Sequence, residues 1–390
     1  MAEKKSYVEA ADFVRAVTIV SVVAVHSTWY MANGGNWVSS GAVLSLLHFT
    51  RESFMALTGF VLTYSLFGRR LNWWQVWKRR YKLVLFPYMI WSAAYMVAFG
   101  SYASIGVFFV TYGRNLLDGG AWFHLYYLLI TMQFYLILPL FLALMKVAKK
   151  HPWSVIIGAL VFQLALFTYD QYFRGPHPTG INAYIGDEVW TYTVYFVIGG
   201  VAALYWPQIR EWLKTHMALV LKLSAATAAL MLTEFFLQTY VGHNMTMADS
   251  VLQPAMVPWA IMTIVLLAAI GVRYEAARQA HPGRWGLVKT IADVSFGIYL
   301  VHPMLLQYWT GILAALGWYH PSFWLDGLTE VLLVAASTVL MLLIGRTPFS
   351  PWVIGRASRQ ARRPGSVVVP AVVASSAQDS NGGVSRVQES

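Results

Sequence analysis

Long apolar segments separated by short polar ones dominate the hydropathy pattern of this chain. Ten of the segments are long enough to cross the hydrocarbon core of a bilayer as helices that rise about 1.5 Å per residue. They lie near residues 12–30, 41–67, 83–100, 122–145, 153–173, 189–206, 217–238, 251–271, 291–315 and 323–344. The pattern therefore predicts an all-α fold, a polytopic membrane helix bundle with about ten transmembrane helices.

The composition supports this prediction and narrows the chemistry. The 390 residues are 58% hydrophobic and only 12% charged, which excludes an ordinary soluble domain. Cysteine is absent from the sequence, so thiol nucleophiles, thiolate metal ligands and disulfides are excluded, and no metal site is expected. The N-terminal residues MAEKKS lack the features of a cleavable signal peptide, so the first apolar segment is expected to remain as a span.

The net charge of +11 is concentrated in alternate connections between the segments. If the N-terminus is inside, the cytoplasmic connections carry nearly all the lysines and arginines, and the external ones hold only Arg114 and Arg174. This asymmetry predicts that both termini are cytoplasmic, in a multi-pass protein of the cell (plasma) membrane. The charge thus reflects topology, and membrane lipids rather than nucleic acid are the expected partners.

Two stretches differ from the apolar pattern. After a membrane-embedded domain at 1–345, residues 346–390 are basic and then rich in serine, glycine and valine, which predicts a disordered cytoplasmic tail. The sequence RRLNWWQVWKRRYK, 69–82, interleaves tryptophans with cations. It predicts a helix lying in the inner interface, and the alternative is a docking surface for a phosphate-bearing cytosolic ligand.

Arg15 and His26 interrupt the first apolar segment. They are eleven residues apart, or about three helical turns, so they share one face and are separated by about 16 Å along the axis. Ionisable groups at bilayer depth are costly and therefore indicate function. The alternative is that Arg15 extends to the inner headgroups while His26 hydrogen-bonds a neighbouring helix.

Three further spans carry polar side chains at helical spacing. These are His48, Arg51 and Glu52 in the second span, His124, Tyr127, Thr131 and Tyr135 in the fourth, and Ser295, Tyr299 and His302 in the ninth. By depth, these histidines, His26, Arg51 and Glu52 lie between the midplane and the outer face, whereas Arg15 and the loop cations lie toward the inner side. The arrangement predicts a chamber that opens outward for one reactant and inward for another.

At these residues the chain resembles the acyltransferase-3 family of integral membrane acyltransferases. The resemblance extends over residues 8–345. It rests on the Arg15 and His26 pair, SFMALTGFVL at 53–62, KRRYKLVLFPY at 78–88, WFHLYYL at 122–128 and SFGIYLVHP at 295–303.

The resemblance implies transfer of an acyl group, usually acetyl, from cytosolic acyl-CoA to a carbohydrate at the outer side of a bacterial membrane. The chain looks most like the stand-alone members that decorate exopolysaccharides or cell-wall glycans. It lacks the external hydrolase-like domain of the two-domain members, so proteins of polysaccharide synthesis or export are possible partners.

Within that resemblance, residue chemistry suggests roles for the candidate side chains. His26 is the expected general base or a transient acyl carrier, and the sequence leaves both open. The expected catalytic residues are His26, Arg15, Glu52 and His302. The expected acceptor-binding residues are Arg51, His48, His124, Tyr127, Ser295 and Tyr299. Acyl-CoA is expected at Arg15, Lys78, Arg79, Arg80 and Lys82, which offer donors and charge to its phosphates.

Other functions remain as alternatives. No Gly-x-Ser-x-Gly elbow, Walker-type phosphate loop or His-Glu-x-x-His pair occurs in the sequence. A transporter or flippase of a glycan or small polar substrate would also use an intramembrane His, Arg and Glu relay. Transporters usually show matched halves with broken helices, and no such pairing is visible here.

Overall fold

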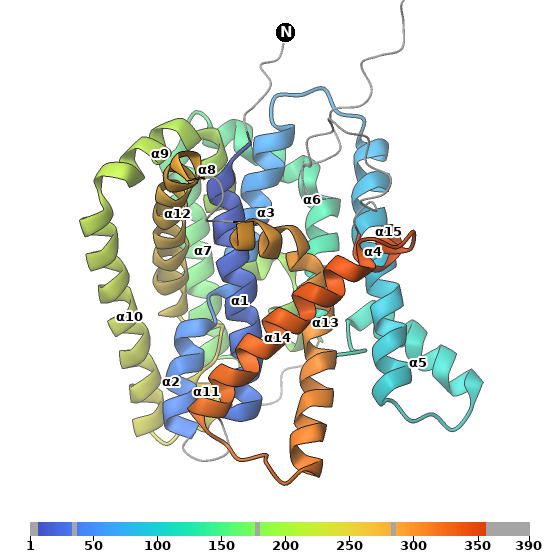
Figure 1. The fold of residues 1–390 in the computed structure, drawn as a ribbon. Coiled ribbons are helices and arrows are strands. Elements are labelled where there is room, and N and C mark those ends of the chain that lie inside the picture. Colours follow the sequence, from blue (N-terminus) through green and yellow to red (C-terminus); the bar gives the residue numbers. More distant parts are fainter. Residues whose placement is uncertain (1–6, 33–36, 176–179, 282–285, 356–390) are drawn as a thin grey trace, which may run out of the picture.

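The computed structural model describes residues 7–32, 37–175, 180–281 and 286–355. Within these ranges all regular structure is helical, and most helices run lengthwise between the two ends of one bundle (Figure 1). The helices are α1 Glu9–Met31, α2 Trp37–Leu47, α3 Thr50–Leu66, α4 Trp73–Phe99, α5 Ile105–Asp118, α6 Tyr126–Ala148, α7 Pro152–Tyr172, η1 Gly180–Asp187, η2 Val189–Tyr192, α8 Thr193–Leu204, α9 Trp206–Thr215, α10 Met217–Tyr240, α11 Met245–Ala248, α12 Met256–Ala280, α13 Gly286–Ala315, α14 Phe323–Ile344 and α15 Ser350–Val353.

Seven of the described helices are long and apolar enough to cross a membrane, or up to eight if the bent pair Val189–Leu204 and Trp206–Thr215 is one span. The other predicted segments are also helical. Segment 41–67 is divided into α2 and α3 at His48 and Phe49, and segment 291–315 lies within α13. The structure therefore supports a multi-pass all-α membrane protein, with fewer qualifying spans than the ten that hydropathy predicts.

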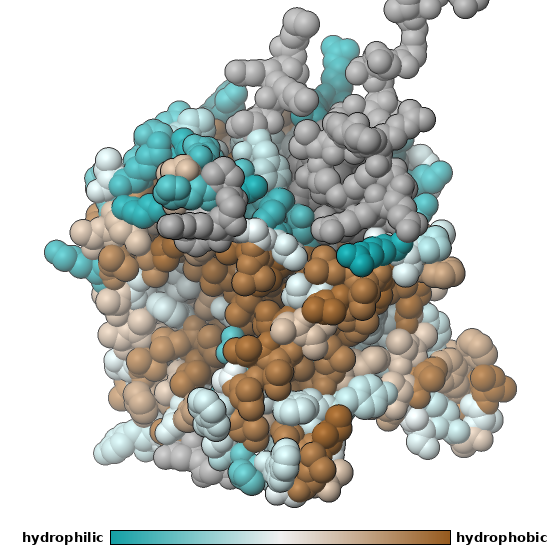
Figure 2. Space-filling view, in the orientation of Figure 1, coloured by the Kyte–Doolittle hydropathy of each residue, from teal (hydrophilic) through white to brown (hydrophobic). Residues whose placement is uncertain are grey.

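The two ends of the bundle differ in polarity. Helix α1 begins, α3 ends and α4 begins at the upper end in Figure 1, whereas α5 projects near the lower end. Figure 2 shows hydrophilic residues gathered above a broad apolar band, with polar residues again below it. We call the upper end the basic end, because the cation-rich turn between α3 and α4 lies there.

Helix α4 corrects one prediction. The tryptophan-rich stretch predicted as a separate interfacial helix is the first part of α4, which runs without a break from Trp73 to Phe99. The side chain of Asn72 caps its start by accepting a hydrogen bond from the Gln75 amide at 3.2 Å. Because no proline or glycine follows until Pro87, nothing in the sequence ends the helix before it enters the bundle.

Helix α1 lies inside the bundle and packs against α12, α13 and α14. Hydrogen bonds to neighbouring helices hold α1 in both its first and its second half. Thr18 and Ser53 on α3 share a hydrogen bond of 2.8 Å, and Thr28 donates to Asp326 on α14 at 2.8 Å. Arg15 is buried and His26 half-buried, so both side chains of the predicted pair face protein.

Helices α3 and α8 approach closely because each presents a glycine to the other. A Cβ at Gly199 would lie 1.8 Å from the carbonyl oxygen of Ala56, and a Cβ at Gly59 would lie 2.3 Å from that of Phe196. Neither position has room for a side chain, as at membrane helix contacts built on small residues. This contact fixes α3, which carries Arg51 and Phe54.

The C-terminal prediction is corrected in part. Residues 346–390 are predicted to be disordered, but Ser350–Val353 forms α15 against α4. Trp91 donates its indole N–H to the Val353 carbonyl at 2.9 Å, and Phe86 packs edge-on against Trp352. These apolar contacts explain why the packed unit extends to residue 355. Residues 356–390, like Lys4 and Lys5, lie outside the described residues.

Candidate active site

Two cavities lie one beyond the other inside the bundle. The cavity nearer the basic end has a volume of about 150 Å³ and contains Arg15 in its lining. The second has a volume of about 190 Å³ and contains His26. We call them the arginine cavity and the histidine cavity. Their linings share Phe54, Tyr127 and Tyr299, so a layer about one side chain thick separates them.

The shared residues form a row of packed rings. The ring centroids of Phe54 and Tyr127 are 6.2 Å apart, and those of Tyr127 and Tyr299 are 5.5 Å apart. The Tyr299 hydroxyl donates a hydrogen bond to the backbone carbonyl of His124. We call Phe54, Tyr127 and Tyr299 the dividing layer. Two of its three members are tyrosines, which place hydroxyls between the chambers.

The polar stripes predicted on the fourth and ninth spans line the cavities together. Thr131 and Tyr135 of α6 face the arginine cavity together with Ser295 of α13, whose hydroxyl donates to the Ala292 carbonyl at 2.9 Å. Tyr127 and Tyr299 reach both cavities. The polar faces predicted on these two helices therefore form two walls of the cavities, one from α6 and one from α13.

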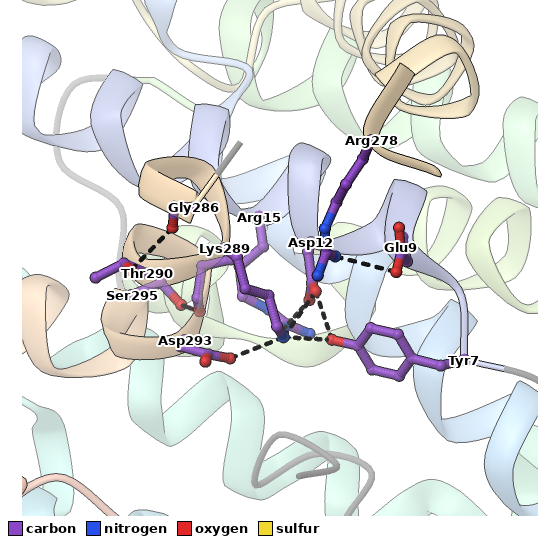
Figure 3. A network of polar contacts seen from close by, with 11 residues as sticks. Tyr7, Glu9, Asp12, Arg15, Arg278, Gly286, Lys289, Thr290, Asp293 and Ser295 are labelled. Carbon is purple, nitrogen blue, oxygen red and sulfur yellow. Dashed lines mark hydrogen bonds and ion pairs between the residues drawn. The ribbon is translucent and has the colours of Figure 1, made fainter. Parts of the chain in front are cut away.

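Arg15 is held by a network at the basic end (Figure 3). Its Nη1 lies 3.4 Å from Oδ1 of Asp12, whose Oδ2 accepts from the Tyr7 hydroxyl at 2.5 Å and from Lys289 Nζ at 2.9 Å. Lys289 also contacts Asp293 at 3.0 Å. Burial, reinforced by the Asp12 carboxylate, raises the pKa of the Tyr7 hydroxyl to about 12, so this group stays a donor at neutral pH. Two carboxylates thus orient the cations beside the arginine cavity.

The histidine cavity joins residues from four distant parts of the chain. Its polar lining consists of His26 on α1, His48, Thr50 and Arg51 where α2 meets α3, His124, Tyr126 and Tyr127 around the start of α6, and Tyr299 on α13. His48 Nδ1 lies 3.0 Å from the carbonyl of Asp249. Arg51 donates to the Tyr126 hydroxyl at 2.7 Å. Four of the side chains that the sequence assigns to one depth therefore meet at this cavity: His26, His48, Arg51 and His124.

His302 lies beside this cavity and contacts two of its histidines. The ring centroids of His302 and His26 are 5.3 Å apart, and those of His302 and His124 are 5.9 Å apart. His302 Nδ1 lies 3.0 Å from the Ile298 carbonyl. Because a carbonyl only accepts, Nδ1 carries the proton and Nε2 keeps a free lone pair. Nε2 has no hydrogen-bond partner within the described ranges.

Glu52 does not join the histidines. Its side chain is fully buried, lines neither cavity, and makes no hydrogen bond to another described residue. The polar groups near it are the Arg51 guanidinium and the hydroxyls of Tyr192 and Tyr195. Glu52, expected to be a catalytic residue, therefore lies outside both cavities, although the adjacent Arg51 lines the histidine cavity.

The predicted cofactor cations divide into two groups along α4. Lys78, Arg79 and Lys82 are exposed. Arg80 is buried and hydrogen-bonds Tyr135, a wall of the arginine cavity. The next residues of the helix, Leu83 and Val84, line that cavity directly. The exposed cations therefore lie within about one helical turn of its walls.

Sequence reasoning missed several residues that shape the site. The spacing of Lys289 and Asp293, four apart on α13, was a visible signal for an ion pair, but nothing indicated that Asp12 would share this lysine. Ile354, which lines the arginine cavity, lies in the predicted tail. Tyr95 packs against His124 with ring centroids 5.3 Å apart, and an isolated tyrosine in an apolar span gives no signal. No group of three or more His, Asp or Glu side chains among the described residues is placed to hold a metal ion.

Fold and cavities together define a multi-pass membrane protein with a divided polar chamber in its helix bundle. A family model described as an acyltransferase domain matches residues 8–346. The chain therefore belongs to the acyltransferase-3 family, which confirms the resemblance seen in the sequence, and it is a membrane acyltransferase. Searches of curated proteins and of solved structures found no match.

Proposed function

We propose that the protein moves an acyl group, most simply acetyl, from cytosolic acyl-CoA to a hydroxyl of a carbohydrate acceptor on a cell-surface glycan. The observation that carries the proposal is the pair of cavities divided by Phe54, Tyr127 and Tyr299. One chamber offers an arginine toward the basic end, and the other offers imidazoles. A donor and an acceptor that approach from opposite sides would meet at this layer.

The proposed membrane orientation places the basic end in the cytoplasm. Lysines and arginines cluster in the connections at that end, as the positive-inside rule requires of short cytoplasmic loops. In this orientation the chain crosses the plasma membrane of a bacterial cell about ten times, and both termini are cytoplasmic. Proteins that build or export the glycan would supply the acceptor from the other side.

The proposed donor site is the arginine cavity with its approach along α4. The exposed Lys78, Arg79 and Lys82 suit the phosphates of acyl-CoA, because cations at a surface bind them with little desolvation cost. Arg15 would then hold the thioester end of the donor. Its guanidinium is supported on one side by Asp12, which leaves a fixed fork of N–H groups to polarise a carbonyl oxygen.

The proposed acceptor site is the histidine cavity. An imidazole of His26, with His302 stacked against it, takes the proton of the acceptor hydroxyl as its oxygen attacks the thioester carbon. The new C–O bond forms, the C–S bond breaks, and the thiolate of CoA receives a proton as it leaves. Tyr299 would bind the oxyanion if its hydroxyl turned from the His124 carbonyl toward the reacting carbon. A route in which His26 first carries the acyl group uses the same contacts.

The test is acyl transfer by the purified protein in lipid vesicles. Radiolabelled acetyl-CoA is added on one side and an oligosaccharide acceptor on the other, and acetyl ester in the glycan is measured. Transfer that requires the two substrates on opposite sides supports the proposal. Transfer that occurs only when both are on one side removes the cross-membrane mechanism, and no transfer to any glycan removes the proposed acceptor class.

The divided chamber also resembles the occluded state of a transporter, so a glycan transporter or flippase is the second candidate. The two are separated by counterflow of labelled glycan in vesicles without acyl-CoA. A transporter would exchange substrate under these conditions, because its cycle does not need the acyl donor. An acyltransferase would show no exchange.

A further inference from the structure

Helix α13 contains a proline, and a tyrosine from another helix hydrogen-bonds the backbone beside the gap that the proline leaves. Pro303 has no N–H, so the carbonyl of Tyr299 loses its helical donor. In a regular helix the next amide, Met304, would donate to the carbonyl of Leu300. Here the Tyr95 hydroxyl accepts from the Met304 amide at 3.1 Å and donates to the Leu300 carbonyl at 2.8 Å.

The Tyr95 side chain is held firmly in this position. It comes from α4, and its relative exposure is 0%. Its ring stacks on Trp122 with centroids 5.1 Å apart and planes at 20°, and it meets His124 edge-on. A hydroxyl inserted into a helical ladder is a recognised cause of a local opening. Because both partners are backbone atoms, the contact sets the path of the helix.

The turn that Tyr95 contacts carries His302. This residue immediately precedes Pro303, and its Nδ1 donates to the Ile298 carbonyl, so its tautomer depends on where the carbonyls of that turn point. Its ring then stacks on His26. A change in the turn would move the His302 ring relative to His26 and alter which of its nitrogens carries the proton.

We propose that Tyr95 is a positioning residue that bridges the backbone beside Pro303 and thereby fixes the ring and tautomer of His302 against His26. This role rests on the proposed function. It gives α4 a second task in acyl transfer, in addition to binding acyl-CoA through its lysines and arginines. Tyr95 lines neither cavity, so it acts through His302 and not on the reactants.

The first test compares two hydroxyl deletions on the same helix. Tyr95→Phe removes the bridging hydroxyl. Tyr88→Phe is the matched control, because Tyr88 is also buried on α4 but donates to the carbonyls of Asn115 and Leu116. We expect Tyr95→Phe to lower kcat by about ten- to a hundredfold, as for a misplaced catalytic group, with the KM for acyl-CoA unchanged. Equal losses in both variants would overturn the proposal.

A double-mutant cycle tests the link to the proline. Pro303→Ala restores the N–H for the Tyr299 carbonyl and removes the ring that crowds this turn. The Met304 amide can then donate to the Leu300 carbonyl without the Tyr95 hydroxyl between them. We expect Tyr95→Phe to add no further loss of kcat in the Pro303→Ala background. A loss of the same size in both backgrounds would show that Tyr95 acts elsewhere.

The third test does not depend on activity. With ¹⁵N-labelled histidine, the His302 signal is identified by its absence in His302→Gln. We expect one Nδ1–H tautomer in the unaltered protein and in Tyr88→Phe, and a mixture in Tyr95→Phe. An unchanged signal in Tyr95→Phe overturns the proposal. A mixture in a protein that transfers no acyl group would support the role of Tyr95 while removing the proposed function.

Discussion

The imidazole rings of His26 and His302 stack with their planes 28° apart, although they come from the first and thirteenth α-helices. The pair lies on the side of the dividing layer away from Arg15. The contact brings the histidine cavity and the proline-containing part of α13 together, so a change in either ring alters the surroundings of the other.

Loss of either ring should reduce acyl transfer strongly. We expect His26→Ala and His302→Gln each to lower kcat by roughly 10²–10⁴-fold, the usual contribution of a general base. Membrane insertion should be normal in both. His216→Gln, an exposed histidine at the end of α9, is the control and should retain activity. Acetylation of glycan at the unaltered level in both variants would contradict the assignment.

Asp12 should matter through Arg15. We expect Arg15→Ala to abolish transfer, and Asp12→Asn to raise the KM for acyl-CoA by about tenfold, since a charge-assisted contact contributes about 1.5 kcal/mol. Steady-state kinetics in proteoliposomes gives both values. Glu9→Gln on the same face of α1 breaks only the half-exposed pair with Arg278 and should change KM little. A similar KM for Asp12→Asn and Glu9→Gln would argue against the network.

The contact between α3 and α8 should be sensitive to a single methyl group. We expect Gly199→Ala to lower the free energy of unfolding by about 1–3 kcal/mol, because its Cβ would overlap the Ala56 carbonyl. Gly158→Ala on α7 is the control: nothing lies within 4 Å of its Cβ, so alanine should be neutral or slightly stabilising. Thermal unfolding in detergent compares the two. Equal free energies of unfolding for the two variants would mean that α3 and α8 can move apart to accept the methyl group without loss of stability.

Asp249 should make stability depend on pH at the end of the bundle opposite the basic end. Burial raises the pKa of its carboxyl to about 7, so the folded state binds a proton that the unfolded state releases near pH 4. Stability relative to Asp249→Asn should therefore be greatest below pH 4 and fall as the pH rises to 7, by on the order of 3 kcal/mol.

Unfolding of the two proteins at a series of pH values measures this slope. Asp118→Asn, which removes an exposed carboxylate from α5, should leave the slope in place. A difference between the unaltered protein and Asp249→Asn that is constant from pH 4 to 7 would contradict the prediction. The backbone of Asp249 holds His48, so the same titration is expected to loosen the histidine cavity.

The sequence predicted which side chains face the interior better than it predicted how the helices meet. Ser295, Tyr299 and His302 could be assigned to one face of a helix because periodicity depends only on local geometry. The dividing layer could not be predicted, since it needs Phe54, Tyr127 and Tyr299 from three helices whose packing is set by contacts such as Gly59 against Phe196. The contact of Tyr95 with the backbone of Leu300 and Met304 is equally non-local.

Where helices begin and end was also only partly predictable. Segment 41–67 is divided at His48 and Phe49, and neither a proline nor a glycine lies at that break. No local signal therefore marks it. The stretch 73–82 was assigned to the interface from its tryptophans, although nothing in it stops a helix. The composition of a segment indicates whether it lies in the membrane interface or in the hydrocarbon core. The direction of its helix axis depends on the helices against which it packs.

Helix α15 has a practical consequence for anyone who shortens or tags this protein. Ile354 forms part of the wall around Arg15, so a chain cut at the end of the last long apolar segment would leave that chamber open on one side. A deletion intended to spare activity should begin after Gly355, and a reporter fused before Ser350 should impair the enzyme even though it lies far from every histidine in the sequence.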